Sequence, residues 1–237
     1  MNSPVVEQII AELHNLSDEA IAEHSQRFFK TGPGEYGEGD KFLGIRVPVI
    51  RKCVKKWRAL DLADVGSLLN SVWHEVRLLA LLIMVDRFSK GDHNIQQEIY
   101  TTYLNNTNSI NNWDLVDCSA HHIVGSFLLN GDRTILRQLA CSDTLWERRI
   151  AIMATLCFIR RGSFSDTLLI AELLRDDPHD LIHKAVGWML REVGKRDLET
   201  EVSFLKKQYK QMPRTMLRYA IEHFPEPERK LYLKGLI

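Results

Sequence analysis

The sequence predicts an all-α protein built as an α-solenoid of repeated helix pairs. Apolar residues recur at helical spacing along almost the whole chain, strand-like alternation is not evident, and one pattern returns at a fixed period. With 45% apolar and 26% charged residues, the composition is that of a folded globular chain. We expect a single helical domain over residues 1–237, because a chain of this length can enclose one sizeable core.

The N-terminal part predicts two helices and then a break. An apolar stripe from Val5 to Leu13 indicates the first helix, and Ser17 can cap the second. Gly32–Gly39 contains four glycines in eight residues, which indicates an exposed loop. We expect the helices to resume at Val47 and Pro48, because proline suits a first helical turn.

The repeat defines the rest of the chain. Its aligned positions, Arg77, Trp113, Arg149 and Lys184, are 36, 36 and 35 residues apart. Each of them opens a longer helix after a shorter one, and pairs at this period are typical of HEAT-like α-solenoids. We expect the longer helices to stack along a concave, positively charged inner face. At i+4, on the same face of each helix, the residues are Leu81, Asp117, Met153 and Trp188.

Asp117 is exceptional because the other repeats carry apolar residues at its position. It follows Trp113 by one helical turn, and Trp188 occupies the equivalent position two repeats later. The three side chains predict a slot with aromatic walls and an anionic floor, which suits a cation. Alternatively, the indoles belong to the core, and Asp117 is solvated or paired with Arg149 or His121.

Basic residues predict a track that matches the phosphates of a duplex. Residues 46–58 carry six cations and no acid, opposite an apolar helical stripe. The expected phosphate contacts are Lys52, Lys56, Arg149, Lys184 and Arg191. The formal net charge is zero, which argues against a protein that coats nucleic acid without selectivity but permits a local basic face. Alternatively, these residues form ordinary solvated faces.

Other patterns exclude several classes of protein. The sequence has no CxxC pair, HExxH, glycine-rich phosphate loop or GxSxG motif, and the four cysteines are expected to be reduced. The N-terminus lacks the basic region of a secretory signal, and the apolar run from Leu78 to Val85 is too short to span a bilayer. We expect a cytoplasmic monomer, nucleoid-associated in a bacterium, with no membrane contact and no cofactor or metal.

Four motifs carry a family resemblance, in the same order: Phe42-Leu-Gly-Ile-Arg-Val-Pro48, Trp113-Asp-Leu-Val-Asp117, Trp146-Glu-Arg-Arg149 and Lys184-Ala-Val-Gly-Trp188-Met-Leu-Arg-Glu192. From about Ile21 to about Phe224 the chain resembles the AlkD-like DNA alkylation repair glycosylases, which are HEAT-like solenoids. The resemblance implies removal of N3- or N7-alkylated purines from double-stranded DNA. It implies catalytic roles for Trp113, Asp117 and Trp188, and a phosphate contact for Arg149.

The implied chemistry needs only one carboxylate. An N3- or N7-alkylpurine is already cationic, so its base leaves as a neutral molecule without a general acid. Asp117 would then stabilise the positive charge that develops on the sugar. Phe28 and Phe29 stand where close catalytic members of the family carry a tyrosine. A non-catalytic solenoid that binds damaged or bent DNA, and a protein-binding scaffold, remain alternatives.

Overall fold

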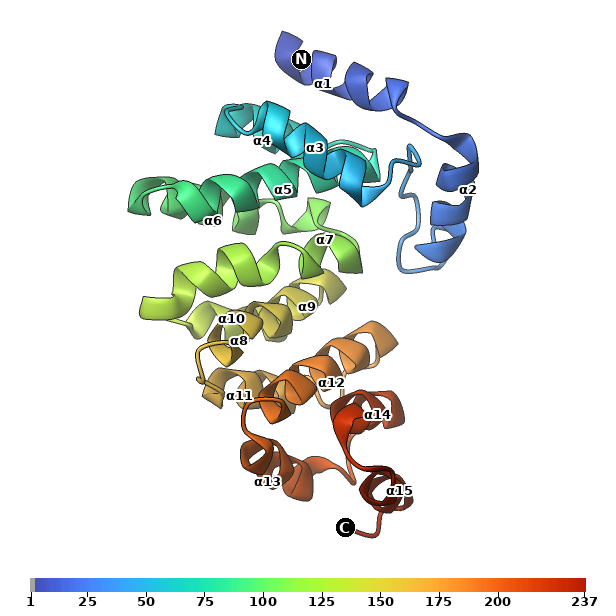
Figure 1. The fold of residues 1–237 in the computed structure, drawn as a ribbon, viewed down its shortest axis with the longest axis vertical. Coiled ribbons are helices and arrows are strands. Elements are labelled where there is room, and N and C mark those ends of the chain that lie inside the picture. Colours follow the sequence, from blue (N-terminus) through green and yellow to red (C-terminus); the bar gives the residue numbers. More distant parts are fainter. Residues whose placement is uncertain (1–2) are drawn as a thin grey trace. The chain divides into compact units, whose positions relative to one another are not determined.

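The computed structural model describes residues 3–237 and confirms the all-α prediction (Figure 1). Helices follow one another in packed pairs, as expected of a helical solenoid, and no β-strand forms within the described residues. An isolated parallel bridge joins Lys41 and Trp73. The backbone forms two compact units, one up to Ile123 and the other from Val124 to Ile237. The single domain and the concave, charged inner face therefore stay predictions.

The first unit is built around one central helix. Its elements are α1 (Pro4–Asn15), α2 (Glu19–Phe28), α3 (Val47–Trp57), α4 (Leu62–Leu69), α5 (His74–Lys90), α6 (His93–Asn105), η1 (Thr107–Ser109) and α7 (Trp113–Asp117). Helices α3 and α4 pack on α5, which also contacts α6 and α7. The first eight residues of α5 are all buried, so the apolar run that begins at Leu78 belongs to a core helix.

Helix α2 differs from its sequence-based description. Its N-cap is Asp18, whose carboxylate accepts a hydrogen bond from the N–H of Ile21 at 3.0 Å. The expectation that Ser17 caps this helix was wrong, because the Ser17 hydroxyl instead donates to the carbonyl of His14 at 2.7 Å. No residue of α2 is buried, and Phe28 at its end is 56% exposed. This helix therefore presents an aromatic ring to solvent.

The chain enters the second unit within η2, a π-helical turn (His121–Gly125). The elements that follow are η3 (Leu128–Asn130), α8 (Thr134–Ala140), α9 (Leu145–Ala154), α10 (Leu156–Ile159), α11 (Ser165–Leu173), α12 (Asp180–Gly194), α13 (Leu198–Gln208), α14 (Arg214–Ala220), η4 (Ile221–His223) and α15 (Glu226–Lys234). Helix α12 is central here, because it packs against α9, α13 and α14.

The predicted order of a shorter and then a longer helix holds for three of the four aligned repeats. Helices α5, α9 and α12 are each longer than α4, α8 and α11, which precede them. The second repeat is the exception, because α7 is a single turn that ends at Asp117. The Ser119 hydroxyl donates to the carbonyl of Leu115 at 2.5 Å, and such side-chain bonds compete with regular helix.

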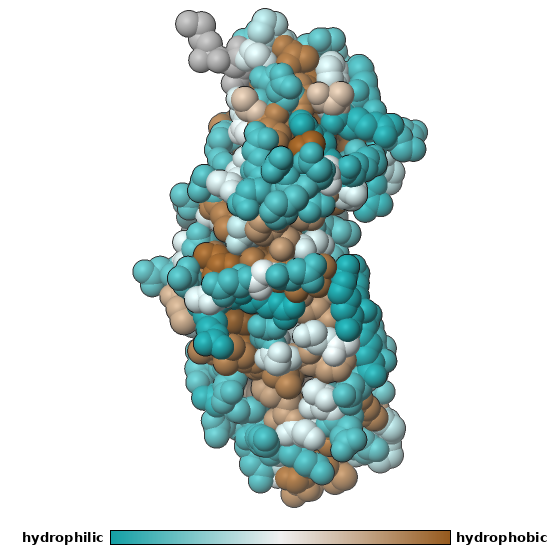
Figure 2. All heavy atoms as spheres, turned by 90° about the vertical axis from the view of Figure 1, so that its left-hand side faces the viewer, coloured by the Kyte–Doolittle hydropathy of each residue, from teal (hydrophilic) through white to brown (hydrophobic). Residues whose placement is uncertain are grey.

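Polar residues cover much of the face drawn in Figure 2, and apolar residues show mainly in patches between them. In the described part of the chain, no helix is both long enough and apolar enough to cross a membrane. The cysteines at positions 53, 118, 141 and 157 carry free thiols, as expected.

Candidate functional site

Helix α7 places Trp113 and Asp117 one turn apart on a single face, and both are half-buried. The helix begins after Asn112, whose fully buried side chain accepts a hydrogen bond from the backbone N–H of Trp113 at 2.9 Å. Asparagine is a favoured N-cap because its side-chain oxygen satisfies a backbone donor that the helix leaves unpaired. The helix therefore holds the two residues one turn apart, and their joint role in a site stays a prediction.

Aromatic rings from the end of α2 pack around Trp113. The ring of Phe29 stacks on the indole with centroids 5.2 Å apart, and Phe28 meets it edge-on at 5.9 Å. Phe29 also stacks on Phe42, with centroids 5.0 Å apart. The resemblance implies a tyrosine near this position, and Phe28 and Phe29 are aromatic rings that lack its hydroxyl. Tyr36 directs its own hydroxyl to the backbone carbonyl of Phe28, at 3.5 Å.

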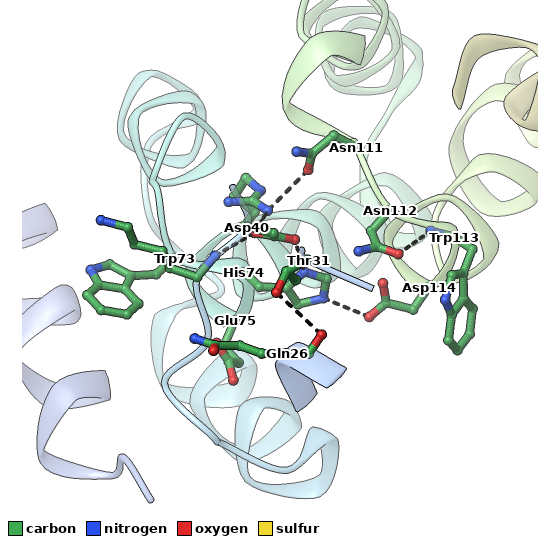
Figure 3. A network of polar contacts seen from close by, with 12 residues as sticks. Gln26, Thr31, Asp40, Trp73, His74, Glu75, Asn111, Asn112, Trp113 and Asp114 are labelled. Carbon is green, nitrogen blue, oxygen red and sulfur yellow. Dashed lines mark hydrogen bonds and ion pairs between the residues drawn. The ribbon is translucent and has the colours of Figure 1, made fainter. Parts of the chain in front are cut away.

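Behind α7 lies a buried charge network centred on His74 (Figure 3). The imidazole Nδ1 lies 2.9 Å from an Asp40 carboxylate oxygen, and its Nε2 lies 2.8 Å from an Asp114 carboxylate oxygen. The guanidinium of Arg77 donates to the other oxygen of Asp40 at 2.5 Å and to the side-chain oxygen of Asn111 at 3.1 Å. The network joins α5 to the loop before α3 and to the first turn of α7.

The network keeps His74 charged. Burial alone would lower the pKa of His74, but the Asp114 and Asp40 carboxylates outweigh it and raise the pKa to about 9. Burial would raise the pKa of Asp40, yet hydrogen bonds and positive charge from His74 and Arg77 hold it below its ordinary value. At neutral pH, an imidazolium ion therefore bridges two carboxylates.

This arrangement corrects the expected role of Arg77. The repeat alignment placed Arg77 on a charged inner face. In the structure, Arg77 is only 4% exposed, and its guanidinium forms an ion pair with Asp40. Spacing along the sequence did not indicate that Asp40, His74 and Asp114 belong to one network. A signal was present, because His74, Glu75 and Arg77 are polar residues at the start of a strongly apolar helix.

Glu75 holds the backbone of the Phe42–Pro48 motif, most of which precedes α3. Its buried carboxylate accepts hydrogen bonds from three consecutive backbone N–H groups, those of Leu43, Gly44 and Ile45, at 2.8, 2.8 and 3.1 Å. Gly44 has φ of 80°, and a Cβ atom there would lie 2.0 Å from the carbonyl oxygen of Asp18. Only glycine fits this close approach. The segment between α2 and α3 is thus anchored on α5.

An open pocket of about 580 Å³ adjoins this cluster. Its walls are mainly apolar and aromatic, and they include Ile21, Phe29 and Phe42. His74 and Asp114 line the same pocket, so the imidazolium–carboxylate pair borders a space next to the α2 aromatic rings.

The basic residues predicted on α3 form an exposed face. Lys52 and Lys56 are exposed, whereas Ile50, Cys53 and Val54 are buried. Lys56 also makes an ion pair with Glu12 at 2.5 Å. The remaining cations of the predicted stretch are exposed too: Arg46, Arg51, Lys55 and Arg58.

The predicted phosphate contacts of the second unit have partners within the chain. Arg149 is 5% exposed and donates to the backbone carbonyl of Leu181 at 2.6 Å. Lys184 pairs with Asp180 at 2.7 Å, and Arg191 pairs with Glu222. The alternative that Arg149 belongs to a solvated face does not hold, because the residue is buried beside α12. The phosphate roles of these three residues stay predictions.

Trp188 lies on α12 and is half-buried. It belongs to the second unit, whereas Trp113 and Asp117 belong to the first. Its proposed place beside Asp117 therefore stays a prediction.

The fold is that of an all-α protein of repeated helix pairs. A family model described as DNA alkylation repair enzyme matches residues 9–224. The chain belongs to this family. No curated protein gives a significant match to the sequence.

Among solved structures, the chain resembles one described as a predicted DNA alkylation repair enzyme from Enterococcus faecalis. The TM-score is 0.71 at 16% sequence identity, and the match covers 89% of this chain and 97% of the other. This likeness concerns the fold alone.

Proposed function

We propose that the protein is a monofunctional DNA glycosylase that hydrolyses the N-glycosidic bond of N3- or N7-alkylated purines in duplex DNA. The observation that carries the proposal is the placement of Trp113 and Asp117 on α7. This single turn presents an indole and a carboxylate on one half-buried face, and a buried ion network holds it in place. Membership of the DNA alkylation repair enzyme family supports the same activity.

The reaction follows from the charge of the lesion. Alkylation at N3 or N7 makes the purine cationic, so cleavage of the bond between base and sugar releases a neutral base. The bonding electrons leave with the base, and positive charge develops on the sugar. The Asp117 carboxylate stabilises this charge and orients the water that attacks the sugar carbon. Its benefit falls mainly on the transition state, because the sugar of the bound substrate carries little charge.

The indole of Trp113 adds to this stabilisation. A cation over a desolvated indole face gains on the order of 1–2 kcal/mol. We propose the same role for Trp188 from the second unit. The sugar is attacked by water and not by an amine, so the DNA strand remains intact.

DNA binding is proposed to begin with the exposed face of α3, where Lys52 and Lys56 would meet phosphates. Arg149, Lys184 and Arg191 are proposed to contribute after exchanging their present partners for phosphate. Such contacts are sequence-independent, which suits a repair enzyme that must scan any DNA. We propose that a monomer performs these steps without cofactor or metal.

The charge of the lesion provides the test. We expect release of free base from duplexes that contain 7-methylguanine or 3-methyladenine, and no release from matched duplexes that contain uracil or 8-oxoguanine. Chromatography of the released bases measures both outcomes. Efficient release of uracil would contradict the one-carboxylate mechanism, since a neutral lesion needs a proton donor. Binding without release of any base would favour the non-catalytic alternative.

A further inference from the structure

A second candidate site lies in the second unit, around Glu201. This glutamate is in the first turn of α13 and is only 2% exposed. Its Oε1 atom is buried and has no hydrogen-bond partner. Burial raises the pKa of Glu201 to about 8, although the positive charge of Arg191 acts in the opposite direction. An unpaired buried carboxyl group is costly, so it is a place to look for a missing ligand.

The backbone at the end of α12 makes room for this carboxyl group. A Cβ atom at Gly194 would lie 1.6 Å from the Oε2 atom of Glu201. The carboxyl group therefore sits against the Cα of the last residue of α12, which no side chain other than hydrogen permits. Glu201 can be buried at this place only because residue 194 is a glycine.

Glu201 and Gly194 line a pocket of about 260 Å³. Leu198, Phe224 and Pro225 supply apolar wall, and Glu228 contributes a second carboxylate to the lining. The pocket thus joins an apolar, partly aromatic surface to a buried carboxyl group that has an unused acceptor atom.

The two permanent cations of this pocket are paired with acids, whereas the carboxyl group of Glu201 has an oxygen without a partner. Three basic residues line the pocket with His223 among them, and of these Arg191 is paired with Glu222 and Lys195 with Glu192 at 2.6 Å. The pocket adjoins the C-terminal end of α12, where the peptide dipoles are negative, and the first turns of α13 and α15, where they are positive, so the helix dipoles favour neither sign. A positive ligand would meet the Glu201 carboxyl group and the ring of Phe224.

We propose that this pocket binds a small organic cation, an alkylammonium or guanidinium group on a short apolar stem, with Glu201 as its counter-ion. The charged end pairs with the unpartnered oxygen, and the stem packs against Leu198 and Phe224. Free polyamines and lysine or arginine side chains carry this chemistry. The proposal does not depend on the glycosylase activity.

The test is calorimetric titration of the full chain at a pH above the Glu201 pKa of about 8, where its carboxyl group is ionised, with n-butylammonium and with n-butanol as an uncharged ligand of similar shape. We expect n-butylammonium to bind at least tenfold more tightly. Glu201→Gln should abolish this preference, and Glu199→Gln, an exposed glutamate on the same helix, should retain it. Circular dichroism checks that both variants are folded. The butanol comparison in the unaltered chain stands even where a variant fails to fold.

Equal binding of the two ligands, or an undiminished preference in Glu201→Gln, would overturn the proposal. Two further titrations, with spermidine and with N-acetyl-lysine amide, distinguish the sources of the cation. Tighter binding of spermidine assigns the site to free polyamines, and tighter binding of the lysine derivative assigns it to a protein side chain. The readout is binding of the cation, so failure of base release would leave it unaffected.

Discussion

At the scale of single residues, two charged side chains have different tasks in the first unit. Asp117 is half-buried and ends α7, one helical turn after Trp113. His74 is fully committed to two carboxylates and is 2% exposed. We expect changes at Asp117 to affect mainly the reaction, and changes at His74 to affect mainly stability.

The exchange Asp117→Asn tests the first task, because it keeps the shape of the side chain and removes its charge. We expect the single-turnover rate of base release to fall on the order of 10²–10³-fold, as for the loss of one electrostatic group in an active site. Affinity for undamaged duplex should stay equal or rise slightly, since a negative charge near the phosphates is removed. An unchanged excision rate, or a melting temperature that falls together with activity, would show that Asp117 is structural.

The second task predicts a pH dependence of stability. The pKa of His74 is about 9 in the folded chain and 6.5 in its unperturbed state. A pKa raised by folding means that the folded state holds the proton more tightly, so the contribution is complete below pH 6.5 and is lost as the pH rises through 9. The shift corresponds to about 3 kcal/mol.

Urea unfolding of the wild type and of His74→Gln at several pH values measures this contribution. The difference between their free energies of unfolding should shrink as the pH rises from 6.5 to 9. Glu201 also titrates near this range, but it is present in both proteins and cancels in the difference. A difference that does not vary with pH would mean that His74 is neutral in the folded chain.

At the scale of elements, α7 depends on its surroundings. A helix of five residues is too short to be stable on its own, because nucleation costs more than one turn returns. Its position is set by the Asn112 cap, by the α2 rings on Trp113 and by the ion pair between Asp114 and His74. The ion pair between Asp114 and His74 therefore fixes the first turn of the helix that ends at Asp117.

A double-mutant cycle of His74→Gln and Asp114→Asn tests this coupling. Each single exchange leaves a buried charged partner behind, so the two effects should overlap, with an interaction energy of about 1–3 kcal/mol in the free energy of unfolding. Asp114→Asn should also slow base release, because α7 loses part of its support. Additive effects on stability would show that the ion pair contributes nothing specific to the position of α7.

At the scale of the whole molecule, positive charge is distributed unevenly. The α3 cations are exposed, whereas those predicted in the second unit are buried or paired with acids. A chain with zero formal net charge therefore carries its most accessible predicted phosphate contacts on one helix of the first unit. DNA affinity should depend on that helix more than on the overall charge.

The salt dependence of DNA binding measures how much α3 contributes to DNA affinity. Lys52→Ala should reduce the slope of log affinity against log salt by about 0.9, the value for one phosphate contact, without changing the melting temperature. Lys90→Ala, at an exposed lysine outside the predicted track, should leave the slope unchanged. Arg149→Ala should lower both affinity and melting temperature, because its guanidinium also holds the Leu181 carbonyl. An equal slope in Lys52→Ala would remove α3 from the DNA interface.

Much of this organisation is readable in the sequence because it depends on local spacing. Helical periodicity predicted the all-α fold, and the repeat located Trp113 and Asp117 one turn apart. The sequence also predicted the amphipathic helix α3, whose apolar stripe is buried and whose cations are exposed. These features need only the 3.6-residue period of a helix and the hydrophobic effect, which act on neighbours along the chain.

The buried charge network around His74 could not be predicted from helical spacing. His74 meets Asp40 across 34 residues and Asp114 across 40, and Arg77 is buried by the same contacts. Periodicity assigns a residue to a face of its helix but not to a partner on another element. Helical spacing predicted Arg77 to be a surface cation, whereas the fold buries it with His74 and Asp40. Charges that are removed from water must find partners within the fold, so these residues form an ion network.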